Sequence, residues 1–157
     1  MYWTNPHVSK IFEAIGAIGD NRIEIIEEVN QAKMYSPSRN KFYTVTWNDD
    51  LTKMMSNDNS AFFVGQLSYP MISVLMLKNK IKYDHKLESI LSNIKWKDIN
   101  KSFKNDFNKT VKFVLDDLKS QGKDTDFVIQ EINKVVEQIA KLRIERLGKR
   151  IKPPKGY

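Results

Sequence analysis

The chain has 157 residues, of which 41% are hydrophobic and 29% charged, a balance that excludes an intrinsically disordered protein. It contains no cysteine, which excludes disulfides, thiolate metal sites and cysteine nucleophiles, and we expect a cytoplasmic location. The formal net charge of +7 is concentrated at one end, because residues 141–157 hold seven of the 26 basic residues and one of the 19 acidic residues.

Asn5 and Pro6 predict the start of a first helix, because Asn is a good N-cap and Pro suits the first helical position. Apolar residues then recur every three or four positions, and Gly19 marks the end of the helix. No basic stretch followed by a long apolar run precedes it, so we expect no signal peptide. The apolar stripe consists of Val8, Ile11, Phe12, Ile15 and Ile18.

Residues 22–47 predict a β-hairpin or a three-stranded antiparallel meander. The segments RIEII at 22–26 and AKMY at 32–35 are candidate strands, and KFYTVTW at 41–47 has the strongest strand pattern. Its β-branched and aromatic residues alternate, which places Tyr43, Val45 and Trp47 on one face.

An abrupt change from polar to apolar residues occurs in SNDNSAFFVGQLSYPMISVLML at 56–77. The apolar run is shorter than the roughly 20 residues that a membrane-spanning helix needs, and Gly65 and Pro70 interrupt it. We therefore expect a buried helix from about residue 70 to residue 80, and no membrane partner. The polar residues around Asp58 favour a turn in which Asn and Asp bind their own backbone.

The second half of the chain predicts helices. HKLESILSNI at 85–94 is a short helix, 96–121 has a sustained apolar stripe, and Gly122 with Asp124 predicts a turn and the cap of a last helix. Two stripes joined by a short turn predict an antiparallel helical hairpin. The predicted fold is α+β and helix-rich, divided into 1–82 and 83–157 or built around one continuous core.

Residues 31–77, taken together, resemble the SWIM zinc-finger family. Tyr43-Thr44-Val45 matches the Tyr-x-Val strand of that family, and MISVLM at 71–76 matches the helix that reads roughly Ile-x-Ala-Val-Leu-Leu. In between lie a polar loop and a glycine, as the resemblance requires. SWIM domains are regarded as binding modules for DNA or proteins, so the resemblance implies binding rather than catalysis.

Every zinc ligand of the SWIM family is absent from this chain. Aligned on the helix, Ser68 and Pro70 occupy the positions of its Cys-x-His pair, while the Cys-x-Cys pair falls either at Met54 and Ser56 or at Ser56 and Asp58. Because zinc needs about four N, S or O ligands in a tetrahedral array, we expect no metal and no cofactor. An apolar plug would replace the metal, built from Phe62, Phe63, Leu67 and Tyr69.

The C-terminal basic segment, residues 141–157, is the candidate nucleic-acid site. Cations along a helix end and a flexible tail, with a kink at Gly148, neutralise phosphates and give salt-sensitive, sequence-independent affinity. DNA is the expected partner. A solvated tail is the plain alternative, and the second functional hypothesis is a protein-interaction adaptor that uses the SWIM-like unit or the helical hairpin. The candidate residues are Lys141, Arg143, Arg146, Lys149, Arg150, Lys152 and Lys155.

The remaining residues give little support for catalysis, and no small-molecule substrate is indicated. His7 and His85 lack the spacing of a histidine metal motif, so we expect no metal site. A magnesium nuclease is a remote third hypothesis, because an acid, a second acid and a lysine follow in the order of restriction-like nucleases, but Gln31 replaces a further acid. We expect a non-enzymatic protein. The nuclease-like residues are Glu13, Asp20 and Lys33.

Overall fold

The structure, a computed structural model, describes residues 1–155; Gly156 and Tyr157, the end of the C-terminal basic segment, lie outside the described residues. The predicted helix-rich α+β fold is confirmed. In chain order the elements are α1 (Ser9–Gly19), β1 (Ile23–Ile26), a 3-10 turn (Glu27–Val29), β2 (Gln31–Tyr35), β3 (Phe42–Trp47), β4 (Lys53–Ser56), a π-helical turn (Ser60–Val64), α2 (Tyr69–Leu77), α3 (Lys86–Leu91), α4 (Trp96–Ser102), α5 (Phe107–Ser120), α6 (Thr125–Lys141) and β5 (Glu145–Arg146).

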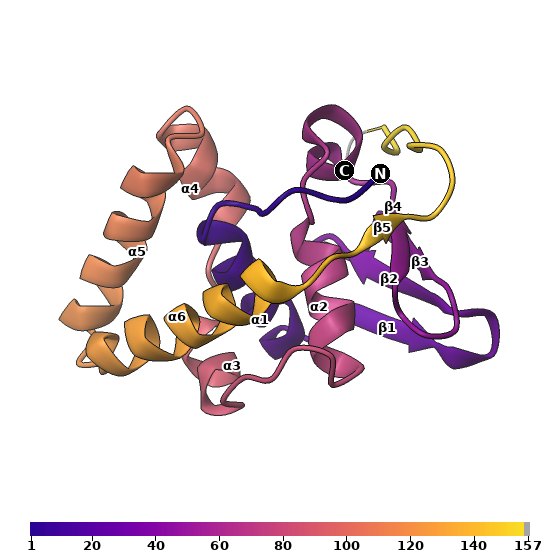
Figure 1. The fold of residues 1–157 in the computed structure, drawn as a ribbon. Coiled ribbons are helices and arrows are strands. Elements are labelled where there is room, and N and C mark those ends of the chain that lie inside the picture. Colours follow the sequence, from indigo (N-terminus) through magenta and orange to yellow (C-terminus); the bar gives the residue numbers. More distant parts are fainter. Residues whose placement is uncertain (156–157) are drawn as a thin grey trace.

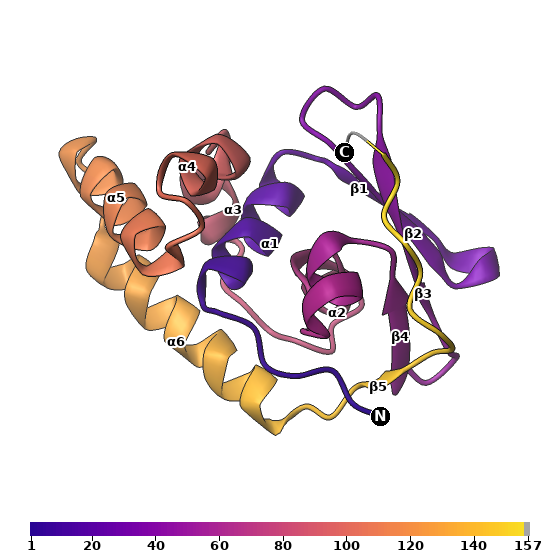
Figure 2. The same cartoon turned by 90° about the horizontal axis from the view of Figure 1, so that it is seen from above.

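The molecule is layered from the sheet to the helices. Figure 1 shows the sheet at one end and α4 and α5 at the other, with the N-terminus near the sheet. Seen from above, α2 lies against one face of the sheet, α1 follows, and the remaining helices cover α1 (Figure 2). We call these two ends the sheet end and the helical end.

The sheet has the order β1-β2-β3-β4-β5, with β1 to β4 antiparallel and β5 parallel to β4. The predicted meander is therefore confirmed as its first three strands. Tyr43, Val45 and Trp47 are buried, as their alternation predicts. Sequence analysis missed β4, because its four residues lie between polar turns, and β5, because a two-residue strand exists only through its partner.

The first helix begins at Ser9, so its predicted start at Asn5 and Pro6 is wrong. Residues 2–4 are extended instead, and they pair with two other segments. The Trp3 amide donates to the Ile144 carbonyl at 2.9 Å, and the Thr4 amide donates to the Gly65 carbonyl at 3.1 Å. These backbone bonds hold the chain away from the helix axis until Val8.

The buried helix expected near 70–80 is α2, in which every residue from Pro70 to Met76 is buried. Within residues 1–155, no helix combines the length and the apolarity that crossing a membrane requires. One cluster of buried side chains runs from Trp3 through α1 and α2 to Ile144, so packing is continuous across residues 82 and 83.

The stripe at 96–121 forms two helices, because Lys104 and Asn105 have positive φ angles and Asp106 caps α5 by accepting from the Lys109 amide at 3.3 Å. The predicted cap of the last helix is confirmed: the Asp124 carboxylate accepts from the Phe127 amide at 3.0 Å. From the turn at Gly122, α5 and α6 diverge, and α6 runs past α1 toward the sheet (Figure 1).

Candidate nucleic-acid interface

The C-terminal basic segment leaves α6 after Lys141 and joins the sheet. Ile144 is 4% exposed and belongs to the core. The Glu145 amide donates to the Thr52 carbonyl, and the Leu147 amide donates to the Met54 carbonyl, each at 2.9 Å. The expectation of a flexible tail is therefore wrong for residues 144–147, because a buried aliphatic side chain and backbone hydrogen bonds fix them.

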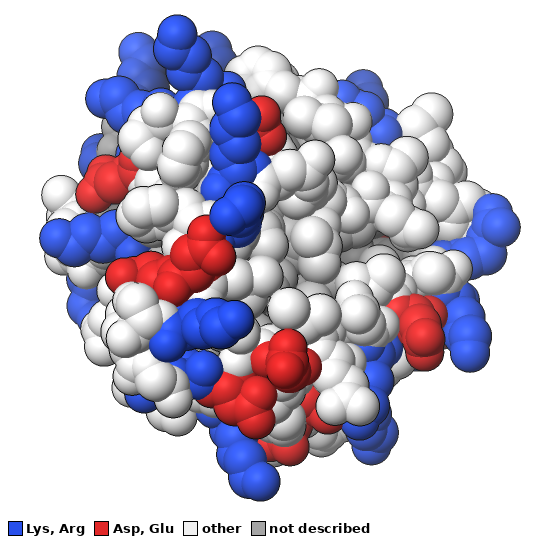
Figure 3. All heavy atoms as spheres, turned by 90° about the vertical axis from the view of Figure 1, so that its left-hand side faces the viewer, with Lys and Arg blue, Asp and Glu red and all other residues white. Residues whose placement is uncertain are grey.

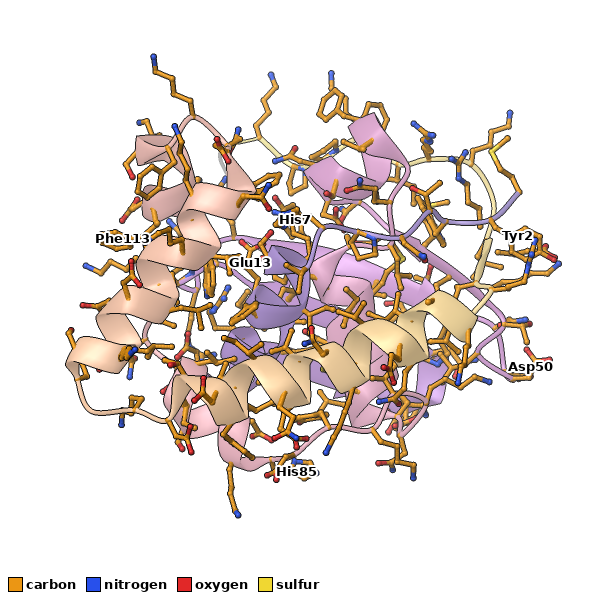
Figure 4. The ribbon with its side chains drawn as sticks, turned by 60° about the vertical axis from the view of Figure 1, so that its left-hand side comes forward. Tyr2, His7, Glu13, Asp50, His85 and Phe113 are labelled. Carbon is orange, nitrogen blue, oxygen red and sulfur yellow. The ribbon has the colours of Figure 1, made fainter. Side chains whose placement is uncertain are left out.

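Two arginines of this segment lie over aromatic residues of the N-terminus. The Arg143 guanidinium is 4.3 Å from the centre of the Tyr2 ring, and the Arg146 guanidinium is 5.0 Å from that of Trp3. Trp3 is fixed, because its indole N–H donates to the Met54 carbonyl at 3.0 Å. Tyr2 is 42% exposed and points outward at the sheet end (Figure 4). Cation–π contacts therefore position both guanidiniums.

The π-helical turn beside this segment is anchored by a buried carboxylate. Asp58 accepts from the Ala61 amide at 2.8 Å and from the Ser56 and Ser68 hydroxyls at 2.5 Å each. Burial raises the pKa of Asp58, while these hydrogen bonds act in the opposite direction. Three of the positions aligned with SWIM zinc ligands thus meet in a hydrogen-bonded cluster, whereas Met54 is in the core. The resemblance to the SWIM family stays a prediction.

The π-helical turn ends at Gly65, where two arginines meet. Gly65 has a φ of +78°, a conformation that favours glycine. A Cβ on Gly65 would lie 2.7 Å from Arg150 Nη2 and 2.9 Å from Arg146 Nη2. Because both nitrogens lie close to this one position, the two guanidiniums are neighbours. Arg150 Nη1 also donates to the Phe62 carbonyl at 2.8 Å. The missing side chain of Gly65 therefore leaves room for two guanidiniums.

The turn that the two arginines contact also carries exposed apolar side chains. Phe63 is 67% exposed and Val64 is 58% exposed, although both precede a buried stretch. The predicted apolar plug is therefore wrong for Phe63, while Leu67 is buried as the plug requires. The Phe62 and Phe63 rings meet edge to face with their centres 4.9 Å apart, which orients Phe63. A short π-helix often marks a functional site.

No basic residue of the segment forms an ion pair with a carboxylate among residues 1–155. The only acid of the segment, Glu145, pairs with Lys53 of β4 at 3.8 Å. Burial lowers the pKa of Arg146, and the neighbouring Arg150 lowers it further. Arg146 is half-buried and the other six cations are exposed. The structure thus brings Arg146 and Arg150 together and spreads the other five along the surface.

The nuclease-like residues have separate partners. The Glu13 carboxylate is buried and lies 2.9 Å from the Lys10 ammonium, and Asp20 accepts from the Asn93 amide at 2.7 Å. Lys33 stands over the Phe42 ring at 4.8 Å. Among residues 1–155, no three His, Asp or Glu side chains are grouped as metal ligands. His7 and His85 contact Asn108 and Glu88, each at 2.7 Å.

A comparison with protein families assigns most of the chain. The family model described as "Uncharacterised conserved protein UCP014422" matches residues 3–145. The chain belongs to this family. No curated protein and no solved structure matches the chain. The UCP014422 match includes Lys141 and Arg143 and ends before Arg146. Arg146 and Arg150 therefore lie outside the matched residues.

Sequence analysis found the cations of this interface but missed its other parts. Tyr2 and Gly65 become relevant only through contacts with Arg143, Arg146 and Arg150. Phe63 becomes relevant through its place in the turn whose Phe62 carbonyl accepts from Arg150. The one local signal is an apolar pair directly before a glycine at the end of a polar turn, a pattern that many core segments share. We use the name arginine pair below for Arg146 and Arg150.

Proposed function

We propose that the protein is a non-enzymatic nucleic-acid-binding protein whose C-terminal basic segment contacts phosphates, with DNA as the expected form. The observation that carries the proposal is the arginine pair, in which two guanidiniums meet at Gly65 without a carboxylate partner among the described residues. A guanidinium presents a planar set of donors that fits two phosphate oxygens.

The arginine pair has an energetic cost that a bound anion would offset. Like charges at this separation repel one another, and burial of Arg146 removes part of its hydration. The Arg146 Nε is buried and makes no hydrogen bond, which adds a desolvation cost. A phosphate beside the two guanidiniums would supply the missing negative charge.

The side chains of the segment suit binding better than catalysis. They offer ammonium and guanidinium groups, and the one carboxylate of the segment, Glu145, is paired with Lys53. Phosphate contacts by such groups give affinity without sequence preference. The cysteine-free sequence is consistent with the cytoplasm, which we propose as the location.

The test compares two variants with the same change in net charge. One carries Arg143→Gln, Arg146→Gln, Lys149→Gln and Arg150→Gln, and the control carries Lys109→Gln, Lys112→Gln, Lys119→Gln and Lys123→Gln at the helical end. Substitution is preferable to truncation after Ala140, because truncation would remove Ile144 from the core and β5 from the sheet. Circular dichroism of both variants checks the fold.

Fluorescence anisotropy of labelled DNA from about 50 to 200 mM salt measures the effect. We expect the segment variant to lose most of the affinity and the salt dependence. The slope of log K against log salt is negative, and each lost phosphate contact makes it less steep by about 0.9 on duplex DNA. The control should retain both. Equal loss in the two variants, or no binding of wild type at low salt, would contradict the proposal and favour the adaptor hypothesis.

A further inference from the structure

We propose that the arginine pair and Phe63 form a site for single-stranded nucleic acid, in which the pair holds a phosphate and the Phe63 ring stacks on an unpaired base. This inference rests on the proposed function and names the form of nucleic acid that the site takes. Its basis is the juxtaposition of an exposed ring and two guanidiniums at one turn.

The backbone links the ring to the cations. Arg150 donates to the carbonyl of Phe62, the residue directly before Phe63, and both guanidiniums lie against Gly65, two residues after it. Asp58 accepts from the Ala61 amide at the start of the π-helical turn, and Gly65 ends the turn. The turn that carries the Phe63 ring is therefore the same turn whose backbone both guanidiniums contact.

The exposure of Phe63 distinguishes between forms of nucleic acid. A ring that is 67% exposed at the tip of a turn offers a face to a flat partner. In a duplex the faces of the bases are stacked on one another, whereas an unpaired base can stack on an aromatic side chain. Phosphate contacts alone would serve a duplex equally well, so the ring carries the preference for a single strand.

A second exposed ring contacts another arginine of the segment. Tyr2 is 42% exposed and holds the Arg143 guanidinium against its face. Arg143 and Arg146 thus lie over aromatic rings, whereas Arg150 binds a backbone carbonyl. Cations interleaved with aromatic rings are the common arrangement of surfaces that bind single strands.

The experiment measures anisotropy of labelled oligo-dT, oligo-U, an abasic strand of equal length and a mixed-sequence duplex. The protein is the full chain, as wild type and as Phe63→Ala, Phe63→Trp and Phe113→Ala. Phe113 is a matched control, since it is 49% exposed and points outward from α5, far from Tyr2 (Figure 4). The abasic strand offers phosphates without bases.

We expect wild type to bind oligo-dT or oligo-U more tightly than the duplex. Phe63→Ala should weaken that binding at least about fivefold, the lower bound for losing one stacked base. Phe63→Trp should preserve it, Phe113→Ala should leave it unchanged, and Phe63→Ala should not alter binding of the abasic strand.

Equal affinity for duplex and single strand, or a Phe63→Ala variant that binds oligo-dT and oligo-U like wild type, would overturn the single-strand inference. The proposed function would survive either result if the segment variant still loses salt-dependent binding. Absence of binding to all four probes would overturn both.

Discussion

Several lysines at the helical end of the molecule pair with acidic side chains, whereas the basic side chains of the C-terminal basic segment have no carboxylate partner among the described residues. Lys112 pairs with Asp116 at 2.8 Å, and Lys134 pairs with Glu131 at 2.8 Å. Both partners lie three or four residues away on the same helix. Figure 3, which faces the helical end, shows basic and acidic side chains interspersed over its surface.

The contrast teaches that a helix can offer a cation a nearby acidic partner that extended chain does not. A helix brings residues three and four apart together, so a local acid satisfies a local base. The chain from Leu142 to Arg150 is extended or irregular, and neighbouring side chains point apart. Arg143 and Arg146 lie over the Tyr2 and Trp3 rings instead, and a ring contact does not use the hydrogen-bond donors that an anion would need.

The largest expected effect comes from the anchor of the π-helical turn. Asp58→Ala would leave the Ser56 and Ser68 hydroxyls and the Ala61 amide without their acceptor, so we expect the free energy of unfolding to fall by about 3 kcal/mol. Urea unfolding measures it. Asp50→Ala is the control, since that carboxylate is exposed and accepts from exposed Thr52. Similar losses in the two variants would show that the turn is not anchored as described.

Gly65→Ala separates backbone strain from the arginine contact. Alanine at the φ of +78° should cost about 1–2 kcal/mol, and its Cβ would displace the arginine pair, so nucleic-acid affinity should fall as well. Gly122→Ala at the helical end is matched, because Gly122 has a φ of +80° and nothing lies within 4 Å of its Cβ. The Gly122→Ala variant should therefore lose stability but keep its affinity for nucleic acid. If Gly65→Ala and Gly122→Ala bound nucleic acid with equal affinity, Gly65 would not contribute to the binding site.

Glu13 and Lys10 form a largely buried ion pair on α1, in which the Glu13 side chain is 9% exposed and the Lys10 side chain 12%. Burial raises the folded-state pKa of Glu13 above its ordinary value of 4.5, against the opposing effect of Lys10. The unfolded chain therefore releases this proton first, and stability falls as pH rises from about 4.5 through the folded-state pKa.

We expect Glu13→Gln to gain stability relative to wild type over that pH range, because glutamine does not titrate. Urea unfolding of both proteins between about pH 4 and pH 8 measures the difference. A difference that is independent of pH, or that falls as pH rises, would show that Lys10 offsets the effect of burial.

The smallest effect belongs to the exposed pairs of the helical end. Lys112→Gln removes the partner of Asp116, but both side chains are largely in water, where such a pair is screened. We expect no measurable change in the unfolding midpoint or in nucleic-acid affinity. A clear loss of affinity would extend the interface onto α5 and remove the contrast between the two ends.

Local patterns predicted a large part of this fold. The alternation in FYTVTW identified β3 and its buried face, and the apolar run after Pro70 identified α2 as a core helix. The cap at Asp124 was also correct. Each of these depends on residues within a few positions of one another. The start of α1 was wrong for the converse reason, since distant backbone partners, the Ile144 and Gly65 carbonyls, hold residues 2–4 extended.

The sequence by itself determined the helix-rich α+β class, the burial of α2 and the concentration of positive charge after residue 140, because composition and periodicity are local properties. Only the tertiary structure decided that this charge joins the sheet as β5, and that Arg150 reaches the Phe62 carbonyl, 88 residues away. Such contacts depend on long-range packing that closes chain segments onto one another, and no short pattern of residues encodes it.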